Sequence, residues 1–197
     1  MKKFLVTVPI IFLLGMILTG CSILRKDDPS AKKITFRLDN SALSVDIPFD
    51  LKNEVLTEES LGRVAPYVKK YVMKSANEED MSVLLIGSVY DKQKIERDFN
   101  MTFEPDLEGA LKGAVGNLQN VQSTEPIKNI KINGLKGKEI NGAMKIKFKG
   151  DNKLSSAVFR MVTFSKGAEI WMVGVVRRPN DDTLEISNKI FKSINLD

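Results

Sequence analysis

The sequence LSSAVFRMVTFSKGAEIWMVGVVR spans residues 154–177 and limits the folds that this chain can adopt. Lys166 and Gly167 divide it into two extended segments, Leu154–Ser165 and Glu169–Arg177. A glycine-containing pair between two such segments is typical of a hairpin turn. In the first segment, apolar residues occur on both faces of the expected strand. Both faces must therefore be buried against other elements. The pattern therefore predicts a central hairpin, with a sheet that is buried on both faces.

Further extended segments flank this hairpin. Residues 34–47 alternate around the turn Asp39-Asn40-Ser41, which predicts an entry hairpin. Residues 81–90 (MSVLLIGSVY) are almost continuously apolar and predict a central strand, and residues 67–76 before them are β-like. Ile127–Ile132 and Leu135–Phe148 flank Asn133-Gly134, a pair that favours a hairpin.

Two amphipathic helices are expected between and after these strands. Asp106–Val121 carries apolar residues at spacings of three and four, and we interpret its glycines (Gly109, Gly113 and Gly116) as allowing close packing on the sheet. The last helix begins near Asn180-Asp181-Asp182, any of which can cap it. Its expected inner face comprises Leu184, Ser187, Ile190, Phe191 and Ile194. The predicted fold class is α+β, an antiparallel β-sheet layered between helices.

Two segments carry a resemblance to a known family. The entry hairpin ends in Ser44-Val45-Asp46-Ile47-Pro48-Phe49, and the chain closes with Phe159 to Trp171 and the helix end Ile190-Phe191-Lys192-Ser193-Ile194. This order of elements resembles the PsbP/Mog1-like domain family over roughly residues 33–197. The resemblance implies an α/β/α sandwich and an adaptor or assembly role. The family has no shared catalytic residues, so the resemblance implies none here.

The N-terminus has the pattern of a bacterial lipoprotein leader. Lys2 and Lys3 precede a 15-residue apolar region, Phe4–Leu18, which is short for a membrane helix. Leu18, Thr19, Gly20 and Cys21 then resemble the lipobox, in which a diacylglyceryl group is attached to the cysteine and the bond before it is cut. The alternative is an ordinary membrane-anchor helix with a chance cysteine.

This leader predicts the organisation and the location of the chain. Residues 1–20 form a signal peptide, residues 21–32 comprise the lipidated Cys21 and a tether, and residues 33–197 form a single domain. Each buried methylene of an acyl chain contributes roughly 0.8 kcal/mol to membrane binding. We therefore expect a lipid anchor at the extracytoplasmic face of the cell membrane.

Composition restricts the chemistry of the domain. The 197 residues carry a formal net charge of +5, or +3 without Lys2 and Lys3, which is too mild for a dedicated nucleic-acid binder. Histidine is absent and Cys21 is the only cysteine, so His-dependent triads and multi-cysteine metal sites are excluded. We expect no catalytic residues, metal or cofactor, although carboxylate pairs and a Ser-Lys dyad among Ser155, Ser156 and Lys153 remain possible.

The most distinctive feature of the domain is a lysine-rich region. Between Lys128 and Lys153 the sequence holds eight lysines against Glu139 and Asp151. Lys145, Lys147 and Lys149 share one face of a strand, opposite apolar residues. One interpretation is a cationic surface that contacts anionic lipid headgroups, a wall polymer or an acidic partner. The other is a solvated sheet face that lysines protect from aggregation.

The sequence thus favours a non-enzymatic binding or assembly module of the cell envelope. The membrane is its expected partner through the N-terminal lipid, together with an envelope protein or an anionic surface polymer, and nucleic acid is not. The alternative is a small-ligand carrier or a carboxylate-dependent hydrolase. A deep pocket with convergent polar groups would favour this alternative, whereas a filled, convex domain would favour the module.

Overall fold

A computed structural model describes residues 32–55 and 61–197. The predicted leader, the lipobox and Cys21 lie outside these ranges. The elements follow one another as β1 (Lys32–Arg37), β2 (Ala42–Ile47), β3 (Lys52–Asn53), η1 (Gly62–Tyr67), β4 (Val68–Asn77), β5 (Met81–Tyr90), α2 (Lys92–Phe99), α3 (Leu107–Gly116), β6 (Val121–Thr124), β7 (Lys128–Ile132), β8 (Leu135–Ile146), β9 (Ser155–Lys166), β10 (Glu169–Arg177), α4 (Asp181–Ser193) and β11 (Asn195–Leu196).

A large antiparallel sheet forms the centre of the domain. Its strand order is β3-β4-β5-β10-β9-β8-β6, and β7 also pairs with β8. The predicted β9–β10 hairpin is confirmed, with Glu169 opposite Lys166 and with Gly167 at a φ of 61°. Because β10 lies between β5 and β9, these three strands are the most enclosed part of the sheet. A mixed α and β domain with antiparallel sheets is therefore confirmed.

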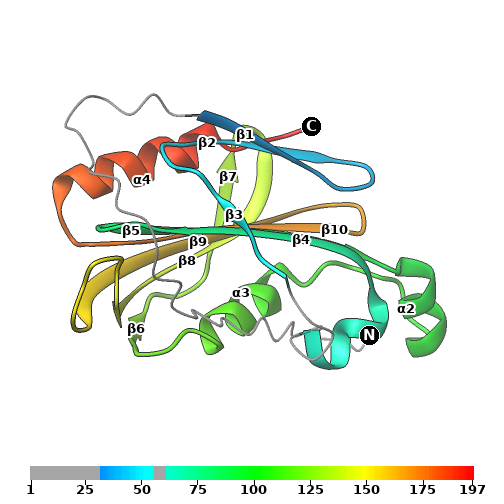
Figure 1. The fold of residues 1–197 in the computed structure, drawn as a ribbon. Coiled ribbons are helices and arrows are strands. Elements are labelled where there is room, and N and C mark those ends of the chain that lie inside the picture. The colour runs from blue at the N-terminus through cyan, green and yellow to red at the C-terminus, as the bar shows by residue number, and fades with distance from the viewer. Residues whose placement is uncertain (1–31, 56–60) are drawn as a thin grey trace.

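Separate hydrophobic cores lie on the two faces of this sheet. One contains Ala110, Leu111 and Ala114 of α3 together with Phe159 and Met161 of β9. The other contains residues of α4, the alternate residues of β9 and the fully buried Trp171. Figure 1 shows α3 and α4 on opposite sides of the sheet. The alternation along β9 thus serves two cores, as predicted.

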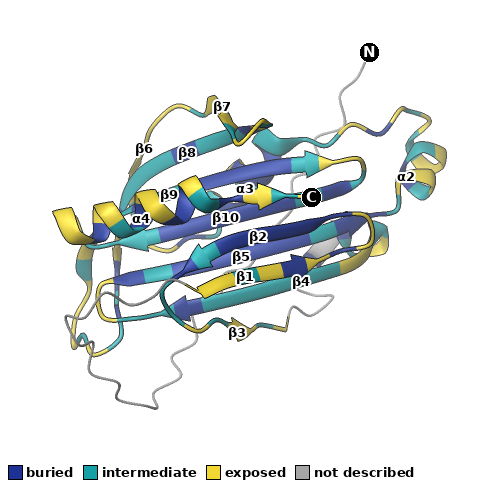
Figure 2. Cartoon of the chain, turned by 90° about the horizontal axis from the view of Figure 1, so that it is seen from above, coloured by how far each residue is buried: buried dark blue, intermediate teal, exposed yellow. Residues whose placement is uncertain are grey.

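A second sheet shares the α4 side of the domain. Its order is β1-β2-β11, so the predicted entry hairpin lies on the large sheet rather than within it (Figures 1 and 2). The turn between β1 and β2 is fixed by the buried Glu169. Its carboxylate accepts hydrogen bonds from Ser41 Oγ and from the backbone N–H of Asn40, and Trp171 Nε1 donates to Ser41 Oγ at 2.8 Å.

The helices differ from the prediction in several places. The helix expected over residues 106–121 ends at Gly116, and β6 follows it. In α4, Asn180 is the cap, but Leu184 is 40% exposed and Thr183 is buried in its place. Within residues 32–55 and 61–197, no helix combines the length and hydropathy needed to cross a bilayer.

The interpretation of the α3 glycines was wrong at two positions. A Cβ on Gly109 would lie 2.4 Å from Asp106 Oδ2, and that carboxylate caps α3 by accepting from the Gly109 N–H. A Cβ on Gly116 would meet nothing within 4 Å. Gly109 therefore makes room for the helix cap, and Gly116 is not needed for contact with the sheet.

Candidate functional site

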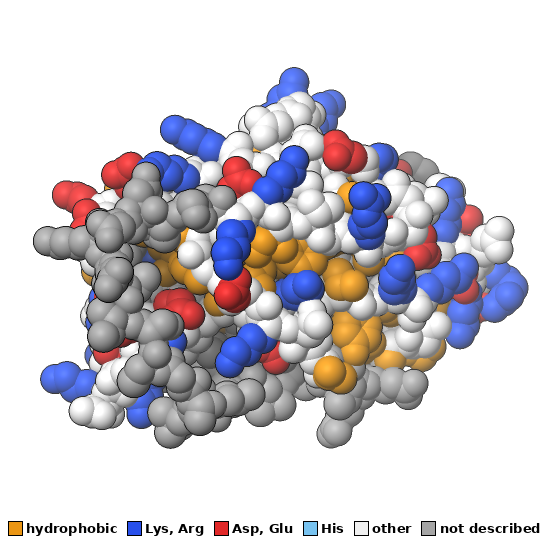
Figure 3. All heavy atoms as spheres, turned by 45° about the horizontal axis from the view of Figure 1, so that its top comes forward, with side chains coloured by type: hydrophobic (Ala, Val, Ile, Leu, Met, Phe, Trp, Pro, Cys, Tyr) orange, Lys and Arg blue, Asp and Glu red, His pale blue; other side chains and the backbone are white. Residues whose placement is uncertain are grey.

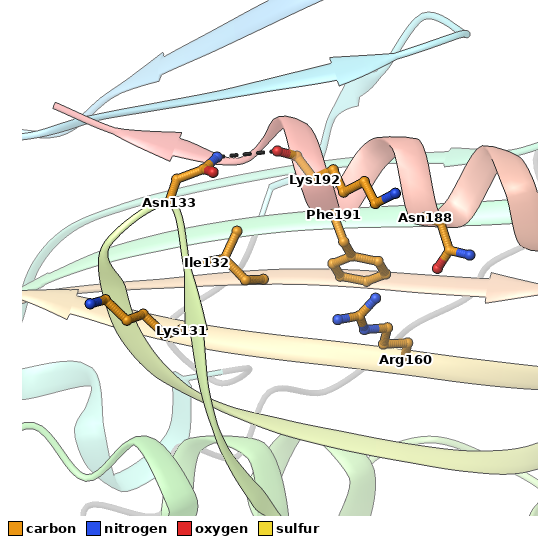
Figure 4. Close-up of a pocket in the computed structure, with 7 residues that line it drawn as sticks. All are labelled: Lys131, Ile132, Asn133, Arg160, Asn188, Phe191 and Lys192. Atoms are coloured by element: carbon orange, nitrogen blue, oxygen red, sulfur yellow. Dashed lines mark hydrogen bonds between the residues drawn. The ribbon is translucent and has the colours of Figure 1, made fainter.

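A polar groove separates α4 from the hairpin formed by β7 and β8. Its volume is about 410 Å³, and we call it the α4 groove. Figure 4 shows the side chains around it, which come from the hairpin, from β9 and from the last two turns of α4. The lining residues are Lys131, Ile132, Asn133, Arg160, Asn188, Phe191 and Lys192.

Arg160 is the most rigidly held of these residues. Its guanidinium carbon lies 4.2 Å from the centre of the Phe191 ring, and its Nε and Nη2 each lie 2.6 Å from Glu139 Oε2. Cation–π stacking and a charge-assisted hydrogen bond both favour one orientation of the guanidinium. The Arg160 side chain is still 31% exposed, so part of this fixed cation remains open to solvent.

Asn133 joins the hairpin to the C-terminal end of α4. It occupies the turn at a φ of 48°, followed by Gly134 at 86°, as the Asn-Gly pair predicts. Its Nδ2 donates to the carbonyl oxygens of Lys192 at 3.1 Å and Ile194 at 2.6 Å. These carbonyls have no partner inside the helix, so one amide satisfies the helix end and fixes the width of the groove.

The α4 groove offers positive charge and amide donors. Lys192 is exposed and has no ion-pair partner among the described residues, and Asn188 stands one turn before it on α4. Figure 4 shows the Lys131 ammonium directed away from Phe191, so Lys131 contributes less than its position suggests. Glu139 is already bound to Arg160. The arrangement is therefore suited to an anionic oxygen group with hydrogen-bond acceptors.

The three lysines singled out from the sequence lie elsewhere. Lys145 is exposed near the end of β8, whereas Lys147 and Lys149 follow the strand. The alternation itself is present, because Met144, Ile146 and Phe148 are all buried. Lys145 lies ten residues beyond Leu135, the first residue of β8, which is about 33 Å along an extended strand. The structure does not bring these lysines to the α4 groove.

Acidic side chains surround the loop that carries Lys149. The Nζ of Lys149 lies 3.0 Å from Oε2 of Glu78, which is on the β4–β5 turn. Arg178 binds Asp80 and Asp151 at 2.6 Å each, and it also lies over the Phe148 ring. Hydrogen bonds from Ser155 and Arg178 hold the pKa of Asp151 below its ordinary value. Part of the lysine charge is therefore balanced locally.

The other chemistry considered from the sequence gains little from the structure. Ser155 Oγ donates to Asp151 at 2.8 Å, so its hydroxyl is directed to a carboxylate rather than to Lys153. Asp181 and Asp182 lie in the first turn of α4, while Asp27-Asp28 and Glu58-Glu59 are outside the described residues. No group of three or more potential metal ligands occurs within residues 32–55 and 61–197.

The sequence contains one signal that points to Arg160. Arg160 interrupts an otherwise apolar set of alternating β9 positions, with Val158 before it and Val162 and Phe164 after it. A charged residue on a strand face that is to be buried needs a partner. Its partners Glu139 and Phe191 are 21 and 31 positions away, and nothing in the local sequence identifies them.

Comparison with known proteins places the chain in no family. No family model matches it, and no curated protein matches it either. Among solved structures, it is similar to LpqN of Mycobacterium tuberculosis, described as involved in cell envelope biogenesis. The sequence identity is 15% and the TM-score is 0.44, over 84% of this chain and 90% of that chain.

Proposed function

We propose that this protein is an extracytoplasmic lipoprotein that serves as a non-enzymatic binding or assembly module of the cell envelope. In this proposal Cys21 carries the lipid and holds the domain at the outer face of the cell membrane. The lipobox-like Leu18-Thr19-Gly20-Cys21 supports the anchor. The PsbP/Mog1-like resemblance supports an α/β/α sandwich with an adaptor role, and the helices on the two faces of the large sheet agree with such layering.

A binding role accounts for the polar groups of the domain better than catalysis does. Glu139, which binds the groove residue Arg160, and Glu125, which binds Lys128, are each paired with a cation. A carboxylate-dependent hydrolase needs one carboxyl group with a raised pKa beside an ionised one. Lys128 instead lowers the pKa of Glu125. This arrangement favours the module over the hydrolase.

The observation that carries the proposal is the fixed guanidinium of Arg160 beside Lys192. Glu139 and Phe191 orient Arg160 before any ligand arrives, and such pre-organisation reduces the entropic cost of binding. Arginine and lysine are the usual recognition groups for phosphate and carboxylate. The ligand class is therefore an anionic group of an envelope component, such as a phosphodiester or a carboxylate of a surface polymer.

Thermal unfolding of the full chain in detergent tests this proposal, with inorganic phosphate and glucuronate as probes. A ligand that binds only the folded state raises the melting temperature. We expect either probe to raise it more than chloride does at equal ionic strength. Arg160→Gln and Lys192→Gln should each remove most of this difference, which is measured within each variant.

Lys189→Gln is the matched control. Lys189 lies on the same helix, is 68% exposed and pairs with Glu185, but it does not line the α4 groove. This variant should respond to the probes like the unmodified chain. No anion-specific rise in any variant, or an equal loss in Lys189→Gln, would contradict an anion site in the α4 groove.

A further inference from the structure

A small apolar cavity lies between the end of β2, the β4–β5 turn and the first turns of α4. Its volume is about 140 Å³, and its apolar walls are Pro48, Phe49, Met81 and Ile186. We call it the Phe49 cavity. An apolar cavity of roughly 150 Å³ can hold a molecule the size of benzene. The Phe49 cavity is therefore the right size for one aliphatic side chain.

The described part of the chain begins beside this cavity. In the β1–β2 ladder Lys32 pairs with Ile47, the residue before Pro48, and its Nζ lies 2.9 Å from Asp50. The two partners of Lys32 are therefore the residues just before and just after Pro48-Phe49, which line the cavity. Figure 3 shows hydrophobic side chains gathered on one face of the domain among scattered basic and acidic ones. Any residue a short distance before Lys32 is within reach of the cavity.

The preceding segment has the chemistry to fill it. Residues 22–31 read SILRKDDPSA, so two apolar residues are followed by Arg25 and Lys26. Leu24 lies eight positions before Lys32, a distance of at most about 28 Å when the chain is extended. The rim of the cavity carries Glu78, Asp80 and Asp182. Lys149 and Arg178 already bind the first two, whereas Asp182 has no ion-pair partner within the described ranges.

We propose that the tether docks onto its own domain, with Leu24 in the Phe49 cavity and Arg25 and Lys26 at its acidic rim. Burial of a leucine side chain contributes roughly 1.5–3 kcal/mol toward holding the segment on the domain. The docked Leu24 then lies only three positions after Cys21, or about 10 Å of extended chain. The domain is consequently held close to its attachment point instead of moving freely on a flexible tether.

Disulfide trapping in the full-length chain tests this docking. Leu24→Cys is combined with Ile186→Cys, which lines the cavity, or with Leu184→Cys, which lies two residues away on α4 and is 40% exposed. A disulfide needs Cα atoms within about 7 Å of each other. Under mild oxidation we expect at least a five-fold higher intramolecular yield for the Ile186 pair. Mass spectrometry of the peptides identifies the linked residues and separates them from any product of Cys21.

Thiol labelling gives a second measurement that needs no cross-link. In an Ile186→Cys background, Leu24→Asp should speed maleimide labelling several-fold, because it removes the side chain that covers the cavity. Ser30→Asp, which adds the same charge outside the apolar pair, should leave the rate unchanged. Equal trapping yields, a predominantly intermolecular disulfide or unchanged labelling in Leu24→Asp would overturn the docking. None of these readouts depends on the α4 groove, so this proposal and the proposed anion site can fail independently.

Discussion

At the scale of single residues, Gly87 and Trp171 pack closely against each other in the sheet. Gly87 faces Trp171 across the β5–β10 ladder, and a Cβ on Gly87 would lie 2.4 Å from Cζ3 of the indole. Trp171 is fully buried and cannot move aside. Overpacking of a core costs about 1–3 kcal/mol, and more where nothing can yield. We predict that Gly87→Ala lowers the free energy of unfolding in urea by about 3 kcal/mol.

Gly116→Ala is the control for this prediction. A Cβ there meets nothing, and alanine favours a helix over glycine by up to about 1 kcal/mol. The Gly116→Ala protein should be equally or slightly more stable than the unmodified chain. If both alanine variants had the same stability, steric contact with Trp171 would not be the reason for glycine at position 87.

Thr163 places a polar side chain in the core of the sheet. Its side chain is fully buried, and its hydroxyl has no hydrogen-bond partner within the part of the chain that the structure describes. An unsatisfied buried hydroxyl costs about 1–3 kcal/mol, and valine has nearly the same shape. Thr163→Val should therefore raise the free energy of unfolding by about 1 kcal/mol.

The hydroxyl of Thr183 provides the comparison. It donates to the carbonyl oxygen of Arg178 at 2.6 Å and is also buried. Thr183→Val should destabilise the protein by about 1 kcal/mol, because it removes a hydrogen bond that is present. The same urea titration measures both variants. If both valine substitutions destabilised the protein, the Thr163 hydroxyl would contribute to stability, and the prediction would be wrong.

At the scale of elements, Asp151 fixes the loop between β8 and β9. Ser155 and Arg178 donate hydrogen bonds to its carboxylate and lower its pKa. Because the folded-state pKa lies below the unfolded value of about 3.9, the stabilisation is fully present above that value and is lost as the pH falls through the folded-state pKa. Asp151→Asn should cost about 1–2 kcal/mol at pH 7 and progressively less below pH 4.

Urea unfolding between pH 2 and pH 7 measures this difference. The matched variant is Glu185→Gln, whose carboxylate pairs with Lys189 but is 70% exposed. Exposed ion pairs contribute little, so this substitution should change stability by less than about 0.5 kcal/mol at any pH. A cost of Asp151→Asn that stayed constant down to pH 2 would contradict an ionic role for Asp151.

The long strands were predictable from the sequence because apolar side chains recur along them in a regular pattern. The four segments from residue 127 to residue 177 reproduce β7 to β10, since apolar alternation and turn residues act locally. By contrast, α2 was not predicted, and it buries only Ile95. A helix this short, with one buried residue, gives only a weak apolar pattern in the sequence. β11 has two residues and forms only because β2 is beside it.

The α4 groove was not predictable for a related reason. Lys192 was expected only on the helix and Asn133 only in a turn, whereas the groove exists because Asn133 bonds to the carbonyl oxygens at the end of α4. That contact joins residues 59 and 61 positions apart. Hydrophobic periodicity locates elements but does not determine which exposed residues of distant elements meet. The sequence showed that the lysine-rich region is basic. It did not show which cations lie around a groove.

At the scale of the whole molecule, α4 lies between the β1–β2 hairpin and the α4 groove. On one side it packs against β2, the partner of the first described strand β1 (Figure 2). It also borders the α4 groove. A lipid at Cys21 would fix the protein to the membrane from the β1–β2 side, and the groove would remain available to an anionic group of the envelope. The proposed division between anchoring and binding depends on one covalent modification.

The intact mass of the mature protein tests that modification most directly. Mass spectrometry of the chain purified from its own membrane should give an N-terminus at Cys21 with the added mass of a diacylglyceryl group. Cys21→Ala should give an unlipidated precursor that keeps residues 1–20. An N-terminus at any other residue, a mature chain without lipid, or normal processing of Cys21→Ala would contradict a lipid-anchored module.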